Sequence, residues 1–591
     1  MVSFLIVSTS GAQVIPAPGA KLHYNEVMFE YEKVSGANQY MLQLAEDTAG
    51  NSFKNLITEQ TDSSTAMMIS GLDFGKKYKW RYAALNSAET PVWNGPYYFE
   101  IDMDSFIHKG IVNFDVTKND TGNRGLIVID ATHTIVDRDG KLVWYMANVN
   151  WFFKFSTRSV SKGGVQIVYK DMAVKPEILD MRVTPAGTIT CLKDSFAIDC
   201  DLNSNIIWQA PNDGRVSGIG GEGYNHDFKR LPNGNYMVLG NEAWRQLPVY
   251  TDTLKMKRKY PYRKIYNGNE YAEVESGTII EYDRNGKVVW SWSSHNYLDS
   301  DALKPIPRNP AFEYQLRPHI NAFSIDKDYQ FVYAGFRDLS RIVKIEKSTG
   351  KVVDSWGSPA LSGGAMHPVA FHLQHDANVL DNGNIAVFNS NDYPNRDSVS
   401  NVMLVSQRPK DSGRVIWQYN CELDSEKRRE ARNGGNVDQL KNGNYLVCMG
   451  NSDRIFEITK DKKIVWQGEI KMRDDNGINY AHRLYRAHYI SSLYPCYFVF
   501  DNDADTIHKK ASNLHVHIFN KGSEGDAYQV KVLTSSGLLI KQFTTAMLPA
   551  NQSIVLPVGP LKHLGKGERV EINIRSITNP DFERSRWVVV N

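Results

Sequence analysis

Three histidines and one arginine of this sequence recur at matching places in a repeated strand pattern. His226, His319 and His375 each lie just before a predicted hairpin, and Arg337 follows on the strand after His319. A lone histidine is more often structural, but three at equivalent positions favour a site. A neutral imidazole can attack an electrophilic group. An arginine fork matches sulfate or phosphate oxygens and does not titrate near neutral pH. These residues therefore predict a site that captures a tetrahedral anion.

Other chemistries for the same side chains are less well supported. Three histidines without a carboxylate partner make a zinc hydrolase only one option, and no resident metal or other cofactor is expected. The sequence also contains no GxxxxGK[ST] phosphate loop, no GxGxxG and no GxSxG elbow. A nucleotide donor would need a phosphate cradle, and none is found.

A loose repeat between about residues 110 and 500 is expected to bring the histidines together. Each unit has a strand, a hairpin, a second strand and a polar turn before a last strand that ends in tryptophan. Three of the hairpins contain Asn-Gly-Asn, for which we predict type I′ turns. The last strands are predicted at 139–144, 205–208, 285–290, 350–356, 413–417 and 463–466.

Six such units fit a β-propeller of six four-stranded blades, in which the tryptophans pack blade against blade. The innermost strand of each blade lines a central channel, so equivalent positions of different blades converge there. The predicted fold class is all-β: a six-bladed β-propeller over 106–506 that contains the site. It is flanked by an N-terminal β-sandwich of fibronectin-III or immunoglobulin type over 14–105 and by a C-terminal β-sandwich over 507–591. The segment 71–81 resembles the corner of fibronectin type III modules in which a tyrosine closes the sandwich.

Composition limits the possible partners. The 591 residues are 42% apolar and carry a formal net charge of only +2, so no global field recruits nucleic acid or an anionic membrane. A local basic run at 255–259 is interpreted as a solvated loop. No stretch approaches the roughly 20 apolar residues of a membrane helix.

The first residues of the chain and its cysteines bear on whether the protein is exported from the cytoplasm. Residues 1–13 form an apolar run that ends in small residues, which is either the tail of a secretory signal peptide or a first strand. The five cysteines cannot form a complete disulfide framework. Cys191 and Cys200 could pair across a hairpin or remain buried thiols. We expect an exported protein, periplasmic or extracellular.

Several of these segments together carry a family resemblance. His319-Ile320-Asn321, then Arg337, then Gln374-His375 is similar to the bacterial arylsulfate sulfotransferases, and the run 485–495 looks like their closing segment. The resemblance covers the N-terminal module and the whole propeller. Two features depart from it: the C-terminal sandwich extends beyond the shorter members, and Cys421 has no nearby partner for the short-loop disulfide of some members.

The resemblance implies a ping-pong transfer of a sulfuryl group from an aryl sulfate donor to a phenolic acceptor without a nucleotide donor. The matching position for the transiently sulfated histidine is His375, with His226, His319 and Arg337 as further catalytic residues and Asn321 as a substrate-binding residue. His372 competes with His375, but strand alternation would point it the other way. The N-terminal module could also pair two subunits into a homodimer.

Three other functions use the same features. A sulfatase or phosphatase would have the same site with water as acceptor. A non-catalytic propeller would bind glycans or proteins through its Trp-rich blades and sandwiches. A quinone-cofactor propeller is a weaker match, because the sequence shows no Cys-Cys or carboxylate signature for calcium and quinone.

Overall fold

The chain is all-β, as predicted, in a computed structural model. One short 3-10 helix, Gly450–Ser452, interrupts the strands of the described part. For β12, β13, β20, β21, β22 and β40 only the backbone is described. The structure describes residues 14–590 except 35, 51, 86–90, 105–109, 111, 148–153, 163–164, 175–177, 194–195, 219–220, 242–244, 249–262, 267–268, 275–276, 295–296, 298–318, 358–366, 393–397, 423–430, 473–483, 503–505, 508–513, 560–564 and 566. Among these residues, no helix is both long and apolar enough to cross a membrane.

Six sheets, numbered 1 to 6 here, occupy the middle of the chain, and their neighbouring strands are antiparallel except for the β28–β29 pair. From the inner strand outwards they are sheet 1, β38 (Ala487–Ile490), β9 (Leu126–Ile129), β10 (Thr134–Val136), β11 (Leu142–Tyr145); sheet 2, β14 (Ile178–Val183), β15 (Ile189–Lys193), β16 (Phe196–Cys200), β17 (Ile206–Gln209); sheet 3, β18 (Asn225–Arg230), β19 (Tyr236–Asn241), β23 (Gly277–Tyr282), β24 (Val288–Ser293); sheet 4, β25 (Ile320–Ile325), β26 (Phe331–Phe336), β27 (Arg341–Glu346), β28 (Lys351–Gly357), β29 (His367–Pro368); sheet 5, β30 (Asp376–Val379), β31 (Ile385–Asn389), β32 (Asn401–Val405), β33 (Val415–Asn420); and sheet 6, β34 (Asn436–Gln439), β35 (Tyr445–Cys448), β36 (Arg454–Ile458), β37 (Ile464–Met472), β8 (Val112–Asn119).

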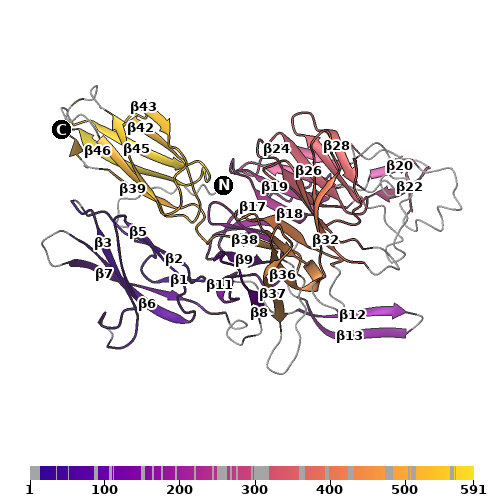
Figure 1. The fold of residues 1–591 in the computed structure, drawn as a ribbon, viewed down its shortest axis with the longest axis horizontal. Coiled ribbons are helices and arrows are strands. Elements are labelled where there is room, and N and C mark those ends of the chain that lie inside the picture. Colours follow the sequence, from indigo (N-terminus) through magenta and orange to yellow (C-terminus); the bar gives the residue numbers. More distant parts are fainter. Residues whose placement is uncertain are drawn as a thin grey trace.

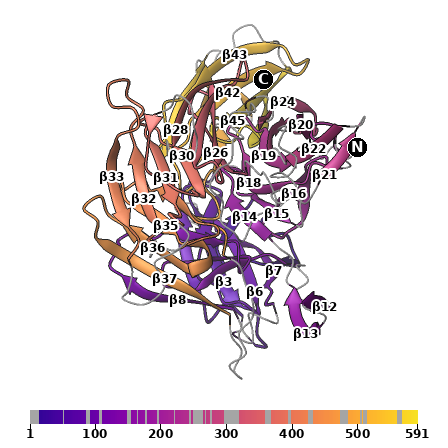
Figure 2. The same ribbon diagram turned by 90° about the vertical axis from the view of Figure 1, so that its right-hand side faces the viewer.

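The inner strands of the six sheets contact one another in a closed cycle. The contacts run from β38 to β14, then to β18, β25, β30 and β34, and from β34 back to β38. Sheet 1 combines early and late parts of the chain, because β38 pairs with β9. Figures 1 and 2 show the sheets beside one another, while the hairpin of β12 (Lys154–Lys162) and β13 (Val165–Val174) projects from them. A second side element of sheet 3 comprises β20 (Arg245–Pro248), β22 (Asn269–Val274) and β21 (Arg263–Tyr266).

The outer-strand tryptophans join each sheet to the next, as predicted for packing residues. Indole N–H groups donate to the carbonyl oxygens of turn residues or to a serine hydroxyl in the following sheet, and Trp208 stacks on Tyr236 with ring centroids 3.8 Å apart. The hydrogen-bonded pairs are Trp144 with Leu202, Trp290 with Lys347, Trp356 with Ser412, Trp417 with Lys460, and Trp466 with Arg138. The last pair links sheet 6 to sheet 1, so these contacts form the same closed cycle.

The Asn-Gly hairpins lie where expected, but the type I′ prediction is wrong. Gly234, Gly383 and Gly443 have φ between +81° and +85°, whereas the asparagines before them are not left-handed. In the first hairpin, Gly234 N–H donates to Leu231 O, and Leu231 N–H donates to Asn235 O. The loop therefore has three residues, with a type I turn closed by a left-handed glycine, so only the glycine needs a positive φ.

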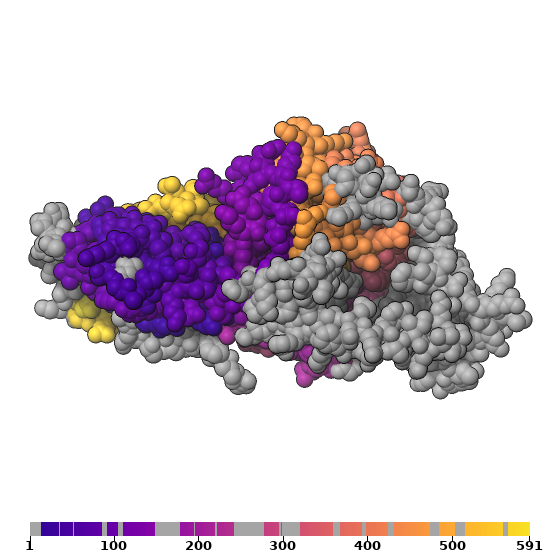
Figure 3. All heavy atoms as spheres, turned by 90° about the horizontal axis from the view of Figure 1, so that it is seen from below, coloured from indigo at the N-terminus to yellow at the C-terminus, as the bar shows by residue number. Residues whose placement is uncertain are grey.

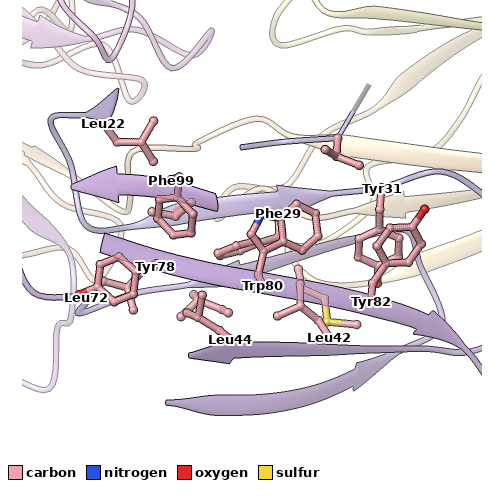
Figure 4. Packing of buried hydrophobic residues seen from close by; sticks show 14 of the residues in the cluster. Leu22, Phe29, Tyr31, Leu42, Leu44, Leu72, Tyr78, Trp80, Tyr82 and Phe99 are labelled. Carbon is pink, nitrogen blue, oxygen red and sulfur yellow. The ribbon is translucent and has the colours of Figure 1, made fainter. Parts of the chain in front are cut away.

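The N-terminal module, residues 14–104, contains two sheets around one core. The sheets are β1 (Ala20–Leu22), β7 (Val92–Ile101), β6 (Lys76–Ala84), β3 (Tyr40–Glu46) and β4 (Thr58–Asp62) in that order, and β2 (Val27–Glu30) with β5 (Ala66–Ile69). Trp80, Phe29 and Tyr82 lie in the middle of the core (Figure 4). The Tyr78 hydroxyl donates to Asp73 O at 3.0 Å, which is the tyrosine contact expected at this corner.

The C-terminal module, residues 498–590, also contains two sheets around one core. The sheets are β39 (Phe498–Asn502), β41 (Leu514–Asn520) and β44 (Ser553–Gly559), and β40 (Thr506–Ile507), β46 (Glu583–Val590), β45 (Arg569–Ser576), β42 (Tyr528–Thr534) and β43 (Leu539–Thr544). Because β39 pairs with β41, this module begins at Phe498, ahead of the predicted boundary at 506/507.

The N-terminal and C-terminal modules lie against each other at one end of the molecule (Figures 1 and 3). Met28 and Ala66 of the first pack on Val499 and Phe519 of the second. Arg584 also binds both carboxylate oxygens of Glu30, at 2.6 and 2.7 Å. The two modules that flank the central sheets in sequence are therefore neighbours in space.

The cysteine prediction has a definite outcome here, whereas two others fall outside the described residues. Cys191 and Cys200 are both buried free thiols, so they do not pair. Residues 1–13 and the basic run 255–259 lie outside the described residues.

Candidate active site

The predicted histidines meet at one end of the cycle of inner strands. His226 is the second residue of β18, His319 directly precedes β25, and His375 directly precedes β30. Since β18, β25 and β30 are neighbours, the three side chains converge. The rings of His226 and His319 have centroids 4.7 Å apart, and the charges of both residues act on His375.

The backbone is unusual where these histidines are placed. His226 and His319 have left-handed φ values of +59° and +54°. The register of β18 against β19 shifts just after Asn225, and that of β25 against β26 shifts after Ile320. Such bulges redirect a side chain at the cost of local strain, and they are over-represented next to active sites.

His375 is a buried imidazole with one nitrogen engaged by the protein. Its Nδ1 lies 2.7 Å from the Ser390 hydroxyl, within hydrogen-bond distance. Burial lowers the pKa of His375 well below its usual value, and the positive charge of Arg337 together with His319 and His226 lowers it further. His375 is therefore neutral at neutral pH, and Nε2 is the nitrogen that can meet a substrate.

Arg337 lies beside His375 and His319. It follows β26, and its backbone N–H donates to His319 O at 2.8 Å. Its guanidinium group bonds Asp338 at 2.6 Å and is 13% exposed. A guanidinium in such a dry setting interacts strongly with an anion, because little water screens it.

His372 lies in a segment that is not a strand, although the alternation prediction assumed one. Residues 371–375 are irregular rather than a strand, and Leu373 has a left-handed φ of +54°. Burial lowers the pKa of His372, Asp392 opposes that shift, and the charge of Arg337 adds to it. Strand alternation therefore does not apply to His372, and both histidines lie within the field of Arg337.

Asn321 supports the loop of His375. Its amide Nδ2 donates to Gln374 O at 2.9 Å, and the residue is fully buried. Gln374 in turn donates to Phe336 O and Arg341 O. Within the described structure, Oδ1 of Asn321 is buried without a hydrogen-bond partner. This acceptor would suit a protonated group, whereas the predicted contact with anionic substrate oxygens would need the amide N–H.

Tyr485 and Arg486 complete the cluster, although the sequence did not assign them to it. The Tyr485 hydroxyl lies 2.8 Å from His226 Nδ1. Arg486 is buried and donates from one nitrogen to Asn321 O at 2.9 Å and to His375 O at 3.4 Å. The other terminal nitrogen forms ion pairs with Asp180 at 3.3 Å and Asp227 at 3.2 Å.

An ion network lies behind the histidines and fixes the inner strands. Burial alone would raise the pKa of Asp180, but Arg182, Arg486 and His488 hold that pKa well below its usual value. Asp180 and Asp227 also accept backbone N–H groups from the next inner strand, those of Phe228 at 2.7 Å and Phe323 at 3.0 Å.

A separate cavity of about 440 Å³ lies at the opposite end of these strands. Val183, Leu380, Leu440 and Ile490 are among its lining residues, and each stands at or just beyond the last residue of an inner strand. The ion network of Arg486 therefore lies between this cavity and the histidines.

Comparison with known families identifies the central region. Residues 263–472 match the arylsulfotransferase (ASST) family model. This match confirms the resemblance to the arylsulfotransferases that the sequence predicts. His319, Asn321, Arg337 and His375 all lie within the matched segment, whereas His226 and Tyr485 lie outside it. The match supports an arylsulfotransferase activity in broad terms, and hence a sulfotransferase enzyme.

The arylsulfotransferase match has no counterpart among curated proteins, none of which matches the chain. The solved structures that match are distant. A protein of unknown function from Bacteroides caccae is 15% identical, covers 58% of this chain and 93% of its own, and has a TM-score of 0.33. Hydrazine synthase from Kuenenia stuttgartiensis is 9% identical, with 65% and 96% covered and a TM-score of 0.28. The beta-propeller domain of Cps50 (Swd1) from Myceliophteria thermophila is 8% identical, with 54% and 93% covered and a TM-score of 0.20.

Proposed function

We propose that this chain transfers a sulfuryl group from an aryl sulfate ester to a phenol through a sulfated His375. The observation that carries the proposal is the state of His375. It is a neutral, buried imidazole with Nδ1 engaged by Ser390 and with Arg337 beside it. A neutral ring nitrogen held next to a fixed cation is what attack on a sulfate ester requires.

In the first half-reaction, the lone pair of His375 Nε2 attacks the sulfur of the donor. An N–S bond forms as the bond between sulfur and the aryl oxygen breaks, and the electron pair leaves on the phenolate oxygen. Arg337, with His226 or His319, stabilises the sulfuryl oxygens and the departing phenolate. Because the leaving group is a phenolate, this step needs no nucleotide donor.

In the second half-reaction, a phenol replaces the released product. A histidine of the cluster takes the proton of the phenol, and its oxygen attacks the sulfur on His375. The N–S bond breaks, and its electron pair returns to Nε2. The reaction converts one aryl sulfate ester into another, so it suits an exported protein in a compartment without nucleotide donors.

We also infer the architecture that holds this site. The cycle of inner-strand contacts and the matching cycle of tryptophan contacts, five hydrogen bonds and the Trp208–Tyr236 stack, support a six-bladed propeller, with the histidines at one mouth of its channel. The paired sheets of the N-terminal and C-terminal modules support two β-sandwiches. A homodimer through the N-terminal module remains a prediction.

Release of p-nitrophenol from p-nitrophenyl sulfate tests the proposal, with and without added phenol and without nucleotide or metal. We expect steady release only when phenol is present, because the sulfated enzyme must pass its sulfuryl group to an acceptor before it turns over again. Steady release without phenol would instead identify a hydrolase that uses water. No release with any phenol would contradict the proposed function.

A further inference from the structure

Resting on the proposed function, we propose that Tyr485 is a positioning residue that keeps His226 ready to exchange a proton with the phenol oxygen at Nε2. The two side chains come from distant parts of the chain and meet at the same end of the inner strands as His375. The structure thereby assigns the proton transfer of both half-reactions to His226, and assigns its orientation to the Tyr485 hydroxyl.

The contact between the two residues is short and well supported. Tyr485 Oη lies 2.8 Å from His226 Nδ1, and the two ring centroids are 5.6 Å apart with an interplanar angle of 37°. Tyr485 is 1% exposed. Its backbone N–H donates to Asp130 Oδ1 at 3.1 Å, and its carbonyl accepts the N–H of Gly435 at 2.8 Å. Asp130 follows β9 of sheet 1 and Gly435 precedes β34 of sheet 6, so contacts with two sheets fix the backbone of Tyr485.

The surroundings of His226 bear on which of its ring nitrogens exchanges the proton. Nδ1 lies 2.8 Å from the Tyr485 hydroxyl, and the centroid of the His319 ring is 4.7 Å from that of the His226 ring. Arg337 and His375 belong to the same cluster, since both His226 and Arg337 act electrostatically on His375. Because the Tyr485 hydroxyl holds Nδ1, we assign the proton exchange with the substrate to the other ring nitrogen, Nε2.

A tyrosine hydroxyl suits this task because its oxygen can accept the Nδ1–H bond in both charge states of the imidazole. In the first half-reaction, His226 Nε2–H gives its proton to the departing aryl oxygen and becomes neutral. In the second, Nε2 takes one proton from the incoming phenol. The proton on Nδ1 stays in place throughout, so each cycle returns His226 to its starting state.

How much this proton transfer accelerates the reaction depends on how basic the leaving group is. A p-nitrophenolate is a stable anion and leaves with little help, whereas an unsubstituted phenolate is much more basic and needs the proton as the bond breaks. A residue that only stabilises the fold would affect both donors equally. Removal of a residue that orients the acid should instead penalise the poorer leaving group selectively.

The test compares Tyr485→Phe with wild type in the full-length protein, using p-nitrophenyl sulfate and phenyl sulfate as donors. We expect kcat/KM to fall less than about threefold for p-nitrophenyl sulfate and at least about tenfold for phenyl sulfate, since a positioned acid contributes mainly where the leaving oxygen is basic. His226→Gln should show the same selectivity more strongly, and the double variant should lose little more than His226→Gln alone.

Tyr489→Phe is the matched control. It also loses a tyrosine hydroxyl from the same segment, but that hydroxyl bonds Asn123 at 2.7 Å. Both donors should respond alike to this change. Equal losses for the two donors in Tyr485→Phe would overturn the proposed positioning role. Absence of phenol-dependent turnover in wild type would instead overturn the sulfuryl transfer itself, so the two failures are distinguishable.

Discussion

His375→Ala is expected to lower kcat/KM for sulfuryl transfer by at least about 10³-fold, equivalent to about 4 kcal/mol of transition-state stabilisation. The variant lacks the nitrogen that forms the N–S bond in the proposed reaction. The measurement is p-nitrophenol release in the presence of saturating phenol. Thermal unfolding should show that the variant is folded.

His372→Ala provides the control, because His372 is three residues away and also lies in the field of Arg337. We expect this variant to keep activity within about tenfold of wild type, since its role is confined to the surroundings of the site. If His372→Ala abolishes transfer while His375→Ala retains it, the nucleophile is His372 and our assignment is wrong.

Arg486→Met is expected to lower the free energy of unfolding by about 3–5 kcal/mol, the usual cost of leaving buried carboxylates without their cation. Asp180 and Asp227 would lose ion pairs of 3.3 and 3.2 Å. The carbonyl groups of Asn321 and His375 would lose their donor as well. We therefore expect the folded variant to have reduced kcat as well as reduced stability, measured by urea unfolding and by activity per folded molecule.

Arg138→Met is the control that separates a loss of stability from a loss of kcat. Arg138 is 5% exposed and forms a buried ion pair with Glu457, and among the described contacts neither residue meets the histidine cluster. A similar loss of stability with normal kcat is expected for this variant. Normal kcat in Arg486→Met as well would show that Arg486 serves the fold and not the positioning of His375.

The local sequence pattern predicted most of the strands. The outer strands that end in tryptophan were found because a polar turn followed by alternating β-branched residues is a local signal. The Asn-Gly turns were located but given the wrong type. A three-residue loop with a left-handed glycine uses the same residues as a type I′ turn, and the backbone φ of the asparagine and the hydrogen bonds distinguish them.

The sequence predicted only part of the site, because some of its contacts join residues that are far apart in the chain. His226, His319 and His375 share a position in the repeat, which is visible in the sequence. Tyr485 and Arg486 reach them because β38 completes sheet 1, so that Tyr485 bonds an aspartate 355 residues away. The run 485–495 stood out by resemblance, yet nothing local indicated which of its side chains meets the histidine cluster.

The contact between His375 and Ser390 could not be predicted for a similar reason. Ser390 follows β31, and its distance from His375 depends on how β30 and β31 pair. The alternation prediction for His372 assumed a strand, but residues 371–375 are irregular and Leu373 is left-handed. Alternation of side chains holds only within a strand.

The most direct test of the account is to look for the sulfated histidine itself. The protein is mixed with p-nitrophenyl sulfate without any acceptor, quenched under alkaline conditions, and its intact mass and peptides are measured. We predict one added sulfuryl group per chain, located on His375, which disappears when phenol is added before the quench. An unmodified protein that nevertheless transfers sulfuryl groups to phenol, or a sulfuryl group on another residue, would contradict transfer through His375.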